Sequence, residues 1–169
     1  MLIRPESPED IKAIEALTAS AFKDKPYSEG TEQIIINRLR DAGALALSLV
    51  ADMNGVIVGH VAFSKVTING EDGDWYGLGP ISVQPDLQKQ GIGSKLMHAG
   101  LAGIRAMGAR GCVLLGDPNY YNRFGFKAYP ALIYAGSPAP EYFMAIPFYE
   151  ADAIPSGSVE FHKAFYDSE

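Results

Sequence analysis

The 169-residue chain lacks most of the features that would place it in a specialised class. It has one cysteine, Cys112, which excludes an internal disulfide and a metal site built from several thiolates. It has no apolar run near the ~18 residues that a membrane-spanning helix needs. Cys112 stands in an apolar run, so we expect a buried core thiol, with a reactive role as the alternative. The composition favours a globular protein, and we expect a single domain over residues 1–169.

Positive charge is also scarce, because 14 Lys and Arg residues stand against 20 Asp and Glu residues and give a net charge of −6. A surface of this sign repels nucleic acid and anionic membranes, so we expect neither as a partner. Glu6, Glu9 and Asp10 stand where a secretory signal needs an apolar segment, and we therefore expect a cytoplasmic protein. His60 and His98 have no Cys or carboxylate partners at ligand spacing, so we expect no metal site.

The pattern of apolar residues predicts both helices and strands. Helical spacing is found in three segments, which are 8–22, 31–42 and 91–107. Three strands separated by the turn signals Asn54-Gly55 and Asn69-Gly70 predict an antiparallel meander, over 46–51, 56–63 and 75–83. Further short strands are predicted at 2–4, 112–115 and 141–149.

The order of these segments predicts the fold class. A strand over 75–83, a helix and a strand over 112–115 imply a right-handed crossover, which makes these two strands parallel. The remaining neighbours are predicted to be antiparallel. We therefore expect an α/β (α+β) fold with a mixed, mostly antiparallel sheet of about six or seven strands, flanked by helices.

The clearest chemical signal is the segment 78–96, which reads as a strand, a short loop with two glycines and a helix. Free N–H groups at a helix start attract an anion, and glycines let a phosphate approach the backbone. A purely structural turn is the alternative. The segment is not a P-loop, because Ser94 precedes Lys95, and it is not a dinucleotide fingerprint, because Leu96 stands where a third glycine is required.

These residues resemble a known family. Gln88-x-x-Gly91-x-Gly93 is similar to the Gln/Arg-x-x-Gly-x-Gly/Ala loop of the GNAT superfamily of N-acetyltransferases. A later Tyr-x-x-x-Gly-Phe, over 121–126, strengthens the resemblance, and the longer run over 116–126 suggests a bacterial acyl-CoA N-acyltransferase subgroup of undefined acceptor. The resemblance covers residues 2–130, and 131–169 would complete the sheet and the acceptor side.

The resemblance implies an N-acyltransferase that moves an acetyl group from acetyl-CoA to a primary amine by direct attack on the thioester. The acceptor would be a small molecule or a peptide, and the protein a monomer or homodimer. The strands over 75–83 and 112–115 would splay to form a slot, and Pro80 either breaks the ladder there or ends an edge strand. A non-catalytic acyl-CoA-binding or sensing module on the same fold is the alternative, and a nucleotide-phosphate binder is a third reading.

The resemblance also implies roles for individual residues. The backbone of 88–94 would hold the CoA pyrophosphate, and Ile81 and Val83 would pair with the pantetheine arm. The Val83 N–H would stabilise the oxyanion, and Tyr121 would protonate the departing sulfur, unless Tyr121 is core packing. The predicted catalytic residues are Tyr121 and Val83, and the predicted CoA-binding residues are Ile81, Ser82, Val83, Gln88, Lys89, Gln90, Gly91, Ile92, Gly93, Ser94, Asn119 and Tyr121.

Three assignments stay open at this level. Lys89 and Lys95 either screen the ligand phosphates or are solvated helix residues. Asn119 stands near a CoA-contacting position of the family, whereas Asp117 would cap a short turn. The strand before the loop has no carboxylate, so the general base is left open: it is one of four acidic residues, Asp74, Asp72, Glu71 and Glu29, or water, or the amine loses its proton directly.

Overall fold

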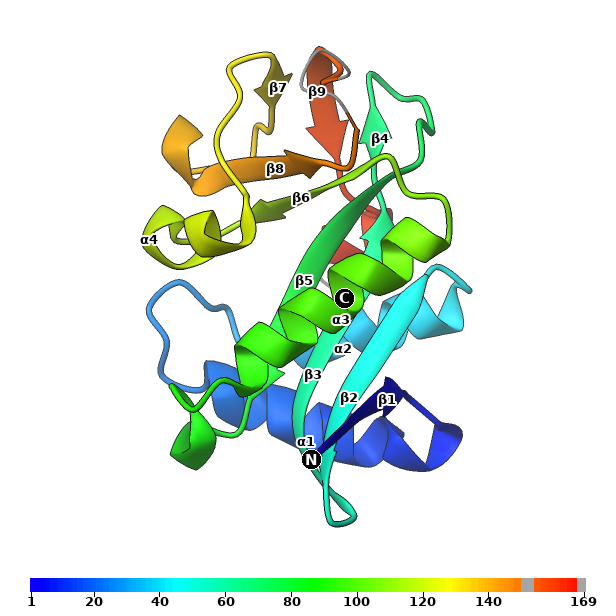
Figure 1. The fold of residues 1–169 in the computed structure, drawn as a ribbon, viewed down its shortest axis with the longest axis vertical. Coiled ribbons are helices and arrows are strands. Elements are labelled where there is room, and N and C mark those ends of the chain that lie inside the picture. The colour runs from blue at the N-terminus through cyan, green and yellow to red at the C-terminus, as the bar shows by residue number, and fades with distance from the viewer. Residues whose placement is uncertain (150–153, 167–169) are drawn as a thin grey trace. The chain divides into compact units, whose positions relative to one another are not determined.

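The computed structural model describes residues 1–149 and 154–166. The helices are α1 (Ile11–Phe22), α2 (Glu32–Asp41), α3 (Ile92–Ala106) and α4 (Pro118–Tyr121). The strands are β1 (Leu2–Pro5), β2 (Leu47–Met53), β3 (Val56–Lys65), β4 (Thr67–Ile68), β5 (Trp75–Val83), β6 (Gly111–Leu115), β7 (Leu132–Ile133), β8 (Phe143–Pro147) and β9 (Gly157–Glu160). One sheet has six strands in the order β1-β2-β3-β5-β6-β8, and a second has the order β4-β9-β7 (Figure 1). The predicted mixed, mostly antiparallel sheet with flanking helices is confirmed.

The chain divides into two compact units. The first unit contains Met1–Phe63 and Gly79–Gly100, and the second contains Ser64–Leu78 and Leu101–Glu169. The chain therefore passes from one unit to the other within β3, β5 and α3. The expectation that residues 1–169 form one domain stays a prediction.

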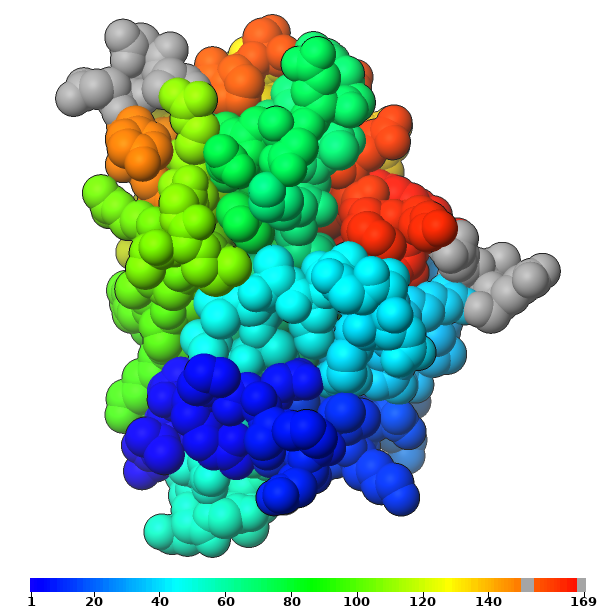
Figure 2. All heavy atoms as spheres, turned by 90° about the vertical axis from the view of Figure 1, so that its right-hand side faces the viewer, coloured from blue at the N-terminus to red at the C-terminus, as the bar shows by residue number. Residues whose placement is uncertain are grey.

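The first unit is built on the β2–β3 hairpin, whose turn is Asn54-Gly55. Both turn residues have positive φ, 55° and 88°, which is the conformation that Asn-Gly hairpin turns adopt. β1 adds to the free side of β2 in an antiparallel register, with Ile3 opposite Ala51. On the face drawn in Figure 2, the blue N-terminal segment accordingly lies against the cyan segment of the hairpin.

Helices cover both faces of this hairpin. Val50 of β2 packs with Ile14 of α1 and Ile36 of α2 in one buried cluster. The next position of the ladder faces the other way, and a Cβ placed on Gly59 would lie only 2.9 Å from Leu96 of α3. Because side chains alternate along a strand, α1 and α2 lie on one face and α3 on the other, as Figure 1 shows for this unit. The lack of a side chain at Gly59 lets α3 approach the strand closely.

The second unit contains the predicted parallel pair. The start of β5 pairs with β6 in parallel, from Trp75 opposite Gly111 to Gly77 opposite Val113. β6 pairs in turn with β8 in an antiparallel register, which confirms the last strand predicted within 141–149. Cys112 is fully buried in β6, and burial raises the pKa of its thiol well above the ordinary value. The expectation of a core thiol is therefore confirmed.

The three-stranded sheet of the second unit was not predicted. β4 and β7 have only two residues each, and they pair with β9, which begins at Gly157. The Asn69 side chain helps to join these segments, because it donates to the Ser156 carbonyl at 3.2 Å and accepts from the Ser158 N–H at 3.0 Å. Strands this short carry no periodicity, so only contacts between distant residues define them.

Two further points concern the whole chain. Parts of the C-terminal segment, 150–153 and 167–169, lie outside the described residues. Within the described ranges, none of the helices combines the length and the apolar character that crossing a bilayer demands.

Candidate active site

The loop that follows β5 changes direction sharply before α3 begins. The Gln84 N–H donates to the Val58 carbonyl at 2.8 Å, which ties the end of β5 to β3. A single 3-10 turn, Pro85–Leu87, follows, and Lys89 and Gly91 then have positive φ, 64° and 90°. Left-handed residues allow the chain to turn tightly over few positions. The predicted loop of two glycines therefore lies at the predicted helix start.

The first backbone N–H groups of α3 point out of the helix start. The Lys95 N–H donates to the Gly91 carbonyl at 3.1 Å, and this is the first hydrogen bond of the helix. The N–H groups of Ile92, Gly93 and Ser94 precede this bond, and helix geometry gives them no intrahelical acceptor. Together with the partial positive charge of a helix N-terminus, they form a place where an anion is stabilised.

The side chains of the loop leave this helix start accessible. Gln88 turns back to β5, and its side-chain amide donates to the Val83 carbonyl at 3.2 Å. Lys89, Gln90 and Gly91 are exposed, and a Cβ built on Gly91 would meet no atom within 4 Å. The glycine at 91 is thus required by its positive φ and not by crowding from the protein.

The end of β5 alternates between two environments. Ile81 and Val83 are half-buried on one side of the strand, and Ser82 is buried on the other with 2% of its surface exposed. Among the described residues, the Ser82 hydroxyl has no hydrogen-bond partner. The Ile81 and Val83 side chains therefore share one side of β5 and Ser82 takes the opposite side.

The parallel ladder of the second unit stops early, as a splayed sheet requires. The β5–β6 pairs end at Gly77 opposite Val113, although β6 continues to pair with β8 as far as Leu115. Pro80, which follows in β5, has no N–H to donate to a ladder.

The segment around Tyr121 belongs to the second unit. Asp117 caps the single turn of α4, because its carboxylate accepts from the Asn119 N–H at 2.9 Å, which confirms the capping role. The Tyr121 ring is half-buried and meets the Tyr120 ring edge-on with centroids 4.9 Å apart. Asn119 itself is exposed. The predicted CoA-binding role of Asn119 is not tested by these contacts and stays a prediction.

The aromatic residues near Tyr121 differ from it in their surroundings. The Arg123 guanidinium lies over the Tyr120 ring, 4.7 Å from its centroid, and donates to the Tyr120 carbonyl at 2.9 Å. Burial raises the pKa of Tyr120, and the charge of Arg123 opposes this rise only in part. Phe124 and Phe126 are buried. Tyr120 is therefore held in packing and cation–π contacts, which give it a structural role.

Two of the candidate bases share one lysine in the second unit. The Lys65 ammonium lies 2.8 Å from the Asp72 carboxylate and 3.3 Å from that of Asp74. The hydrogen bond from Lys65 lowers the pKa of Asp72, which weakens Asp72 as a base. In the described part of the chain, no group of three or more His, Cys, Asp or Glu side chains is arranged to hold a metal ion. The absence of a bound metal stays a prediction.

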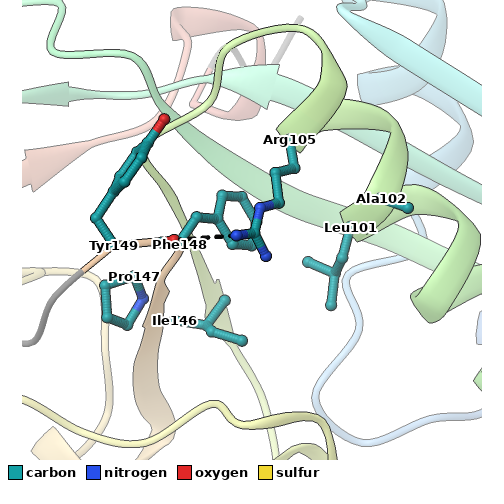
Figure 3. Close-up of a pocket in the computed structure, with 7 residues that line it drawn as sticks. All are labelled: Leu101, Ala102, Arg105, Ile146, Pro147, Phe148 and Tyr149. Atoms are coloured by element: carbon teal, nitrogen blue, oxygen red, sulfur yellow. Dashed lines mark hydrogen bonds between the residues drawn. The ribbon is translucent and has the colours of Figure 1, made fainter.

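A separate hollow of about 360 Å³ in the second unit contains none of the predicted site residues. Figure 3 shows that the Arg105 side chain lies over the Phe148 ring, with 5.6 Å from the guanidinium carbon to the ring centroid. Arg105 also donates to the Phe148 carbonyl at 3.4 Å. The guanidinium is thus already engaged by the wall of the hollow. The lining residues are Leu101, Ala102, Arg105, Ile146, Pro147, Phe148 and Tyr149.

Comparison with known proteins gives this arrangement its context. Residues 2–129 match the family model of the acetyltransferase (GNAT) domain. The chain belongs to the GNAT family of acetyltransferases. The resemblance seen in the loop and in the tyrosine motif is thereby confirmed, and so is the prediction of an N-acetyltransferase.

Individual members of the family are similar over most of their length. YhbS of Escherichia coli K12, named as an uncharacterized N-acetyltransferase, is 40% identical over 128 residues, which are 75% of this acetyltransferase and 74% of YhbS. A crystal structure of a GNAT family acetyltransferase from Brucella melitensis in complex with acetyl-CoA is 48% identical, with a TM-score of 0.86 and 97% of each chain covered. The structure of YhbS from Escherichia coli in complex with CoA is 33% identical, with a TM-score of 0.90, and covers 99% of this chain and 93% of that one.

Sequence reasoning found the loop of this acetyltransferase but overlooked Gly116. This glycine directly follows β6, and a Cβ placed on it would overlap the Tyr121 ring. The signal that could have found it is a glycine five residues before the predicted acid, inside the run over 116–126 that carries the resemblance.

Proposed function

We propose that this GNAT chain transfers an acetyl group from acetyl-CoA to a primary amine and binds the CoA pyrophosphate at the start of α3. The observation that carries the proposal is the set of outward-facing N–H groups at Ile92, Gly93 and Ser94. The preceding loop turns sharply at two left-handed residues and leaves these groups accessible. The ligands in the Brucella melitensis and YhbS structures, acetyl-CoA and CoA, support the same ligand class.

The proposed reaction gives tasks to three of the predicted residues, Ile81, Val83 and Tyr121. The neutral amine nitrogen attacks the thioester carbonyl, the C–N bond forms and the C–S bond breaks. The Val83 N–H stabilises the carbonyl oxygen while it carries negative charge, and backbone groups of Ile81 and Val83 hold the pantetheine arm. Tyr121 gives its phenolic proton to the departing thiolate, and its phenolate regains a proton from water. A phenol suits this step, because its ordinary pKa of about 10 is near that of an alkyl thiol.

The amine must lose one proton in the same reaction. Asp72 is a poor acceptor for it, because Lys65 lowers its pKa. We propose that water takes this proton, with Asp74, Glu71 and Glu29 as the side-chain alternatives. A net charge of −6 favours a cationic amine as acceptor, either a small molecule or a peptide.

Turnover with a panel of amines tests the activity. The purified chain is mixed with acetyl-CoA and with spermidine, a lysine-containing peptide or an amino-acid amide, while free thiol is followed. Release of thiol that depends on the amine, with the acetylated amine identified by mass spectrometry, is the expected result. CoA binding without turnover by any amine would instead favour the non-catalytic acyl-CoA-binding module.

Gly91 tests the pyrophosphate assignment. A Gly91→Leu variant places a side chain at a residue with φ of 90°, in front of the predicted anion site, and we expect CoA affinity to fall roughly tenfold or more. The matched control is Gly108→Leu, because Gly108 follows the other end of α3 with φ of 96° and also has nothing near its Cβ. Both variants carry the same kind of backbone strain, so equal CoA affinities by calorimetry would remove the loop from the site.

Tyr121 tests the predicted acid. We expect Tyr121→Phe to lower kcat at least about tenfold, the lower end of what general acid catalysis contributes, with little change in CoA affinity. Tyr120→Phe is the control, because Tyr120 is packed against Tyr121 and has no assigned role in proton transfer. A kcat for Tyr121→Phe equal to that of the wild type would exclude the phenol from the mechanism.

The cellular setting and the assembly are also proposals. We propose a cytoplasmic protein that is a monomer or a homodimer. Light scattering of the purified chain measures the assembly, and a fluorescent fusion shows the compartment.

A further inference from the structure

The Tyr121 ring lies directly against the backbone of Gly116. A Cβ placed on Gly116 would lie 2.9 Å from Tyr121 Cδ2, 3.4 Å from Cζ and closer still to Cε2. Real Cβ atoms essentially never come that near to a ring carbon, so the ring occupies the space that any other residue at 116 would fill. The position of the Tyr121 ring therefore depends on the absence of a side chain at Gly116.

The backbone on both sides of this contact is fixed. The Gly116 N–H donates to the Tyr142 carbonyl at 2.9 Å, which extends the β6–β8 pairing by one residue. The Tyr121 N–H donates to the Asp117 carbonyl at 3.0 Å within the capped turn of α4. A side chain added at Gly116 would therefore move the Tyr121 ring and not the main chain.

Other rings limit where the Tyr121 ring can go. The Tyr120 ring meets it edge-on at 4.9 Å, and the Phe126 ring lies 6.4 Å away at 74°. Phe126 has only 1% of its surface exposed, so it cannot yield without opening the core. A displaced Tyr121 ring would have to turn away from both neighbours.

The backbone of Gly116 does not itself demand a glycine. Its φ lies outside the left-handed region, unlike those of Gly108 and Gly125 nearby in the chain. Alanine would fit the main chain at 116 without strain. The requirement for a small residue at 116 thus comes from the space that the Tyr121 ring takes.

We infer that Gly116 is a positioning residue for acetyl transfer, because it leaves the space in which the Tyr121 phenol is held for protonation of the departing CoA thiolate. The inference rests on the proposed role of Tyr121. In that step the C–S bond breaks, the sulfur receives the phenolic proton, and the acetyl group remains on the amine. A ring displaced by about 1 Å loses this alignment, which costs roughly ten- to a hundredfold in rate.

The test compares Gly116→Ala with Tyr121→Phe and with the double variant, using acetyl-CoA and spermidine, or acetyl-CoA hydrolysis where spermidine is not an acceptor. We expect Gly116→Ala to lower kcat roughly ten- to a hundredfold with the KM for acetyl-CoA unchanged. In the Tyr121→Phe background the same change should have almost no further effect, because the group it positions has gone. The fall of kcat at alkaline pH, where a phenol loses its proton, should disappear in both single variants.

Gly136→Ala is the matched control. A Cβ at Gly136 would lie 2.7 Å from Tyr134 Cζ, so this variant also pushes on a tyrosine ring, but on one with no assigned part in catalysis. Its kcat and its pH profile should equal those of the wild type. An equal loss of kcat in Gly136→Ala would show that ring displacement anywhere in the unit impairs the enzyme, and would overturn the inference.

Three kinetic outcomes separate the inference from the function on which it rests. A wild-type kcat for Gly116→Ala, or a full additional loss in the double variant, overturns the positioning role while the role of Tyr121 stands. A wild-type kcat for Tyr121→Phe removes both. If Gly116→Ala does not fold, thermal unfolding of Gly116→Ala/Tyr121→Ala decides: recovery of the melting temperature to that of Tyr121→Ala supports the ring contact, and no recovery contradicts it.

Discussion

Two polar regions of the first unit differ in how their hydrogen-bonding groups are satisfied, by solvent in one region and by other protein groups in the other. The start of α3 leaves the backbone N–H groups of Ile92 and Gly93 without intrahelical acceptors, facing outward, where water satisfies them at little cost. The polar core cluster, which is Glu6, Arg40, Ser48 and His60, pairs most of its groups with one another, although the buried His60 Nδ1 has no hydrogen-bond partner among the described residues. An unpaired donor is affordable at the surface and serves for binding, whereas a buried one destabilises the fold.

Each member of the polar core cluster has a defined partner. Arg40 donates two hydrogen bonds of 2.9 Å to the Glu6 carboxylate, and Ser48 also donates to that carboxylate. The Ser48 hydroxyl lies 2.7 Å from His60 Nε2. Because the carboxylate only accepts, the Ser48 proton points to Glu6, and His60 Nε2 carries the proton that Ser48 accepts. The cluster therefore holds a neutral histidine beside an ion pair.

The protonation of the cluster follows from burial. Desolvation lowers the pKa of His60 to about 4, and the nearby positive charge of Arg40 adds to this, while Glu6 opposes it. Burial alone would raise the pKa of Glu6, but hydrogen bonds from Arg40 and Ser48 outweigh it and keep that pKa below its ordinary value. The cluster is therefore most stable at a pH where His60 is neutral and Glu6 is ionised, which is above the pKa of both groups.

Removing the cation of the cluster should have the largest effect on stability. Arg40→Met removes the cation from the half-buried Glu6 carboxylate and leaves it only the Ser48 hydroxyl, so we expect the free energy of unfolding to fall by about 3 kcal/mol, the lower end of the range for broken buried pairs. Denaturant titration measures this, with the exposed Arg110→Met as control. CoA affinity should not change, because the loop is separate from the cluster. A loss below about 1 kcal/mol would place the pair with ordinary surface ion pairs.

Acid should break the cluster next. The pKa of His60 is about 4 in the folded state against an ordinary value of 6.5, so the unfolded chain takes up the proton first as pH falls. The contribution of neutral His60 to the free energy of unfolding is fully present above pH 6.5. It is lost between pH 6.5 and 4, by about 3 kcal/mol for a pKa difference of 2.5. The lowered pKa of Glu6 acts in the same direction. His60→Gln should flatten this slope in pH-dependent unfolding, and His98→Gln, on the exposed face of α3, should keep it.

Removing one hydroxyl from each region is a finer test of the difference between the polar core cluster and the start of α3. Ser48→Ala removes the group that bridges Glu6 and His60, and we expect a loss of about 2 kcal/mol because buried polar atoms lose their partner. Ser94→Ala removes a hydroxyl from the first turn of α3, where the backbone N–H is the proposed binding group, so we expect a loss of less than about 0.5 kcal/mol. Equal losses in thermal unfolding would mean that the two regions do not differ as described.

The smallest expected effect concerns the charge beside the loop. Lys89 is exposed and stands one turn before α3, and we expect Lys89→Ala to weaken CoA binding roughly two- to fivefold, with the difference vanishing in high salt. Lys12→Ala, on the exposed side of α1, is the control. Calorimetry at low and high salt measures the CoA affinity of the variant. If the affinity of Lys89→Ala equals that of the wild type at both salt concentrations, Lys89 is a solvated residue with no part in CoA binding.

Much of the fold could be predicted because its signals are local. Helix and strand periods located α1, α2, α3 and the β2–β3 hairpin, and the predicted turn at Asn54-Gly55 is present, with positive φ at both residues. The order of strand, helix and strand was enough to predict the parallel β5–β6 pair. The three-stranded sheet could not be predicted, because β4 and β7 have two residues each and join partners far away in the sequence.

The candidate site divides in the same way. Gln88-x-x-Gly91-x-Gly93 was recognisable because a glycine loop at a helix start leaves a fixed spacing in the sequence. The contact of Gly116 with Tyr121 was not, because nothing in the sequence tells which glycine lies under which ring. The polar core cluster was missed for the same reason: Glu6, Ser48 and His60 are far apart in the chain.

The sequence by itself determined the family, the order of the elements and the place of the phosphate-binding candidate, since each depends on residues within one or two turns of the chain. Tertiary structure alone decided which glycine makes room for the Tyr121 ring, which strands form the small sheet and which polar side chains meet in the core. Those contacts join residues that are distant in sequence, and their energies come from packing and desolvation, which no local pattern encodes.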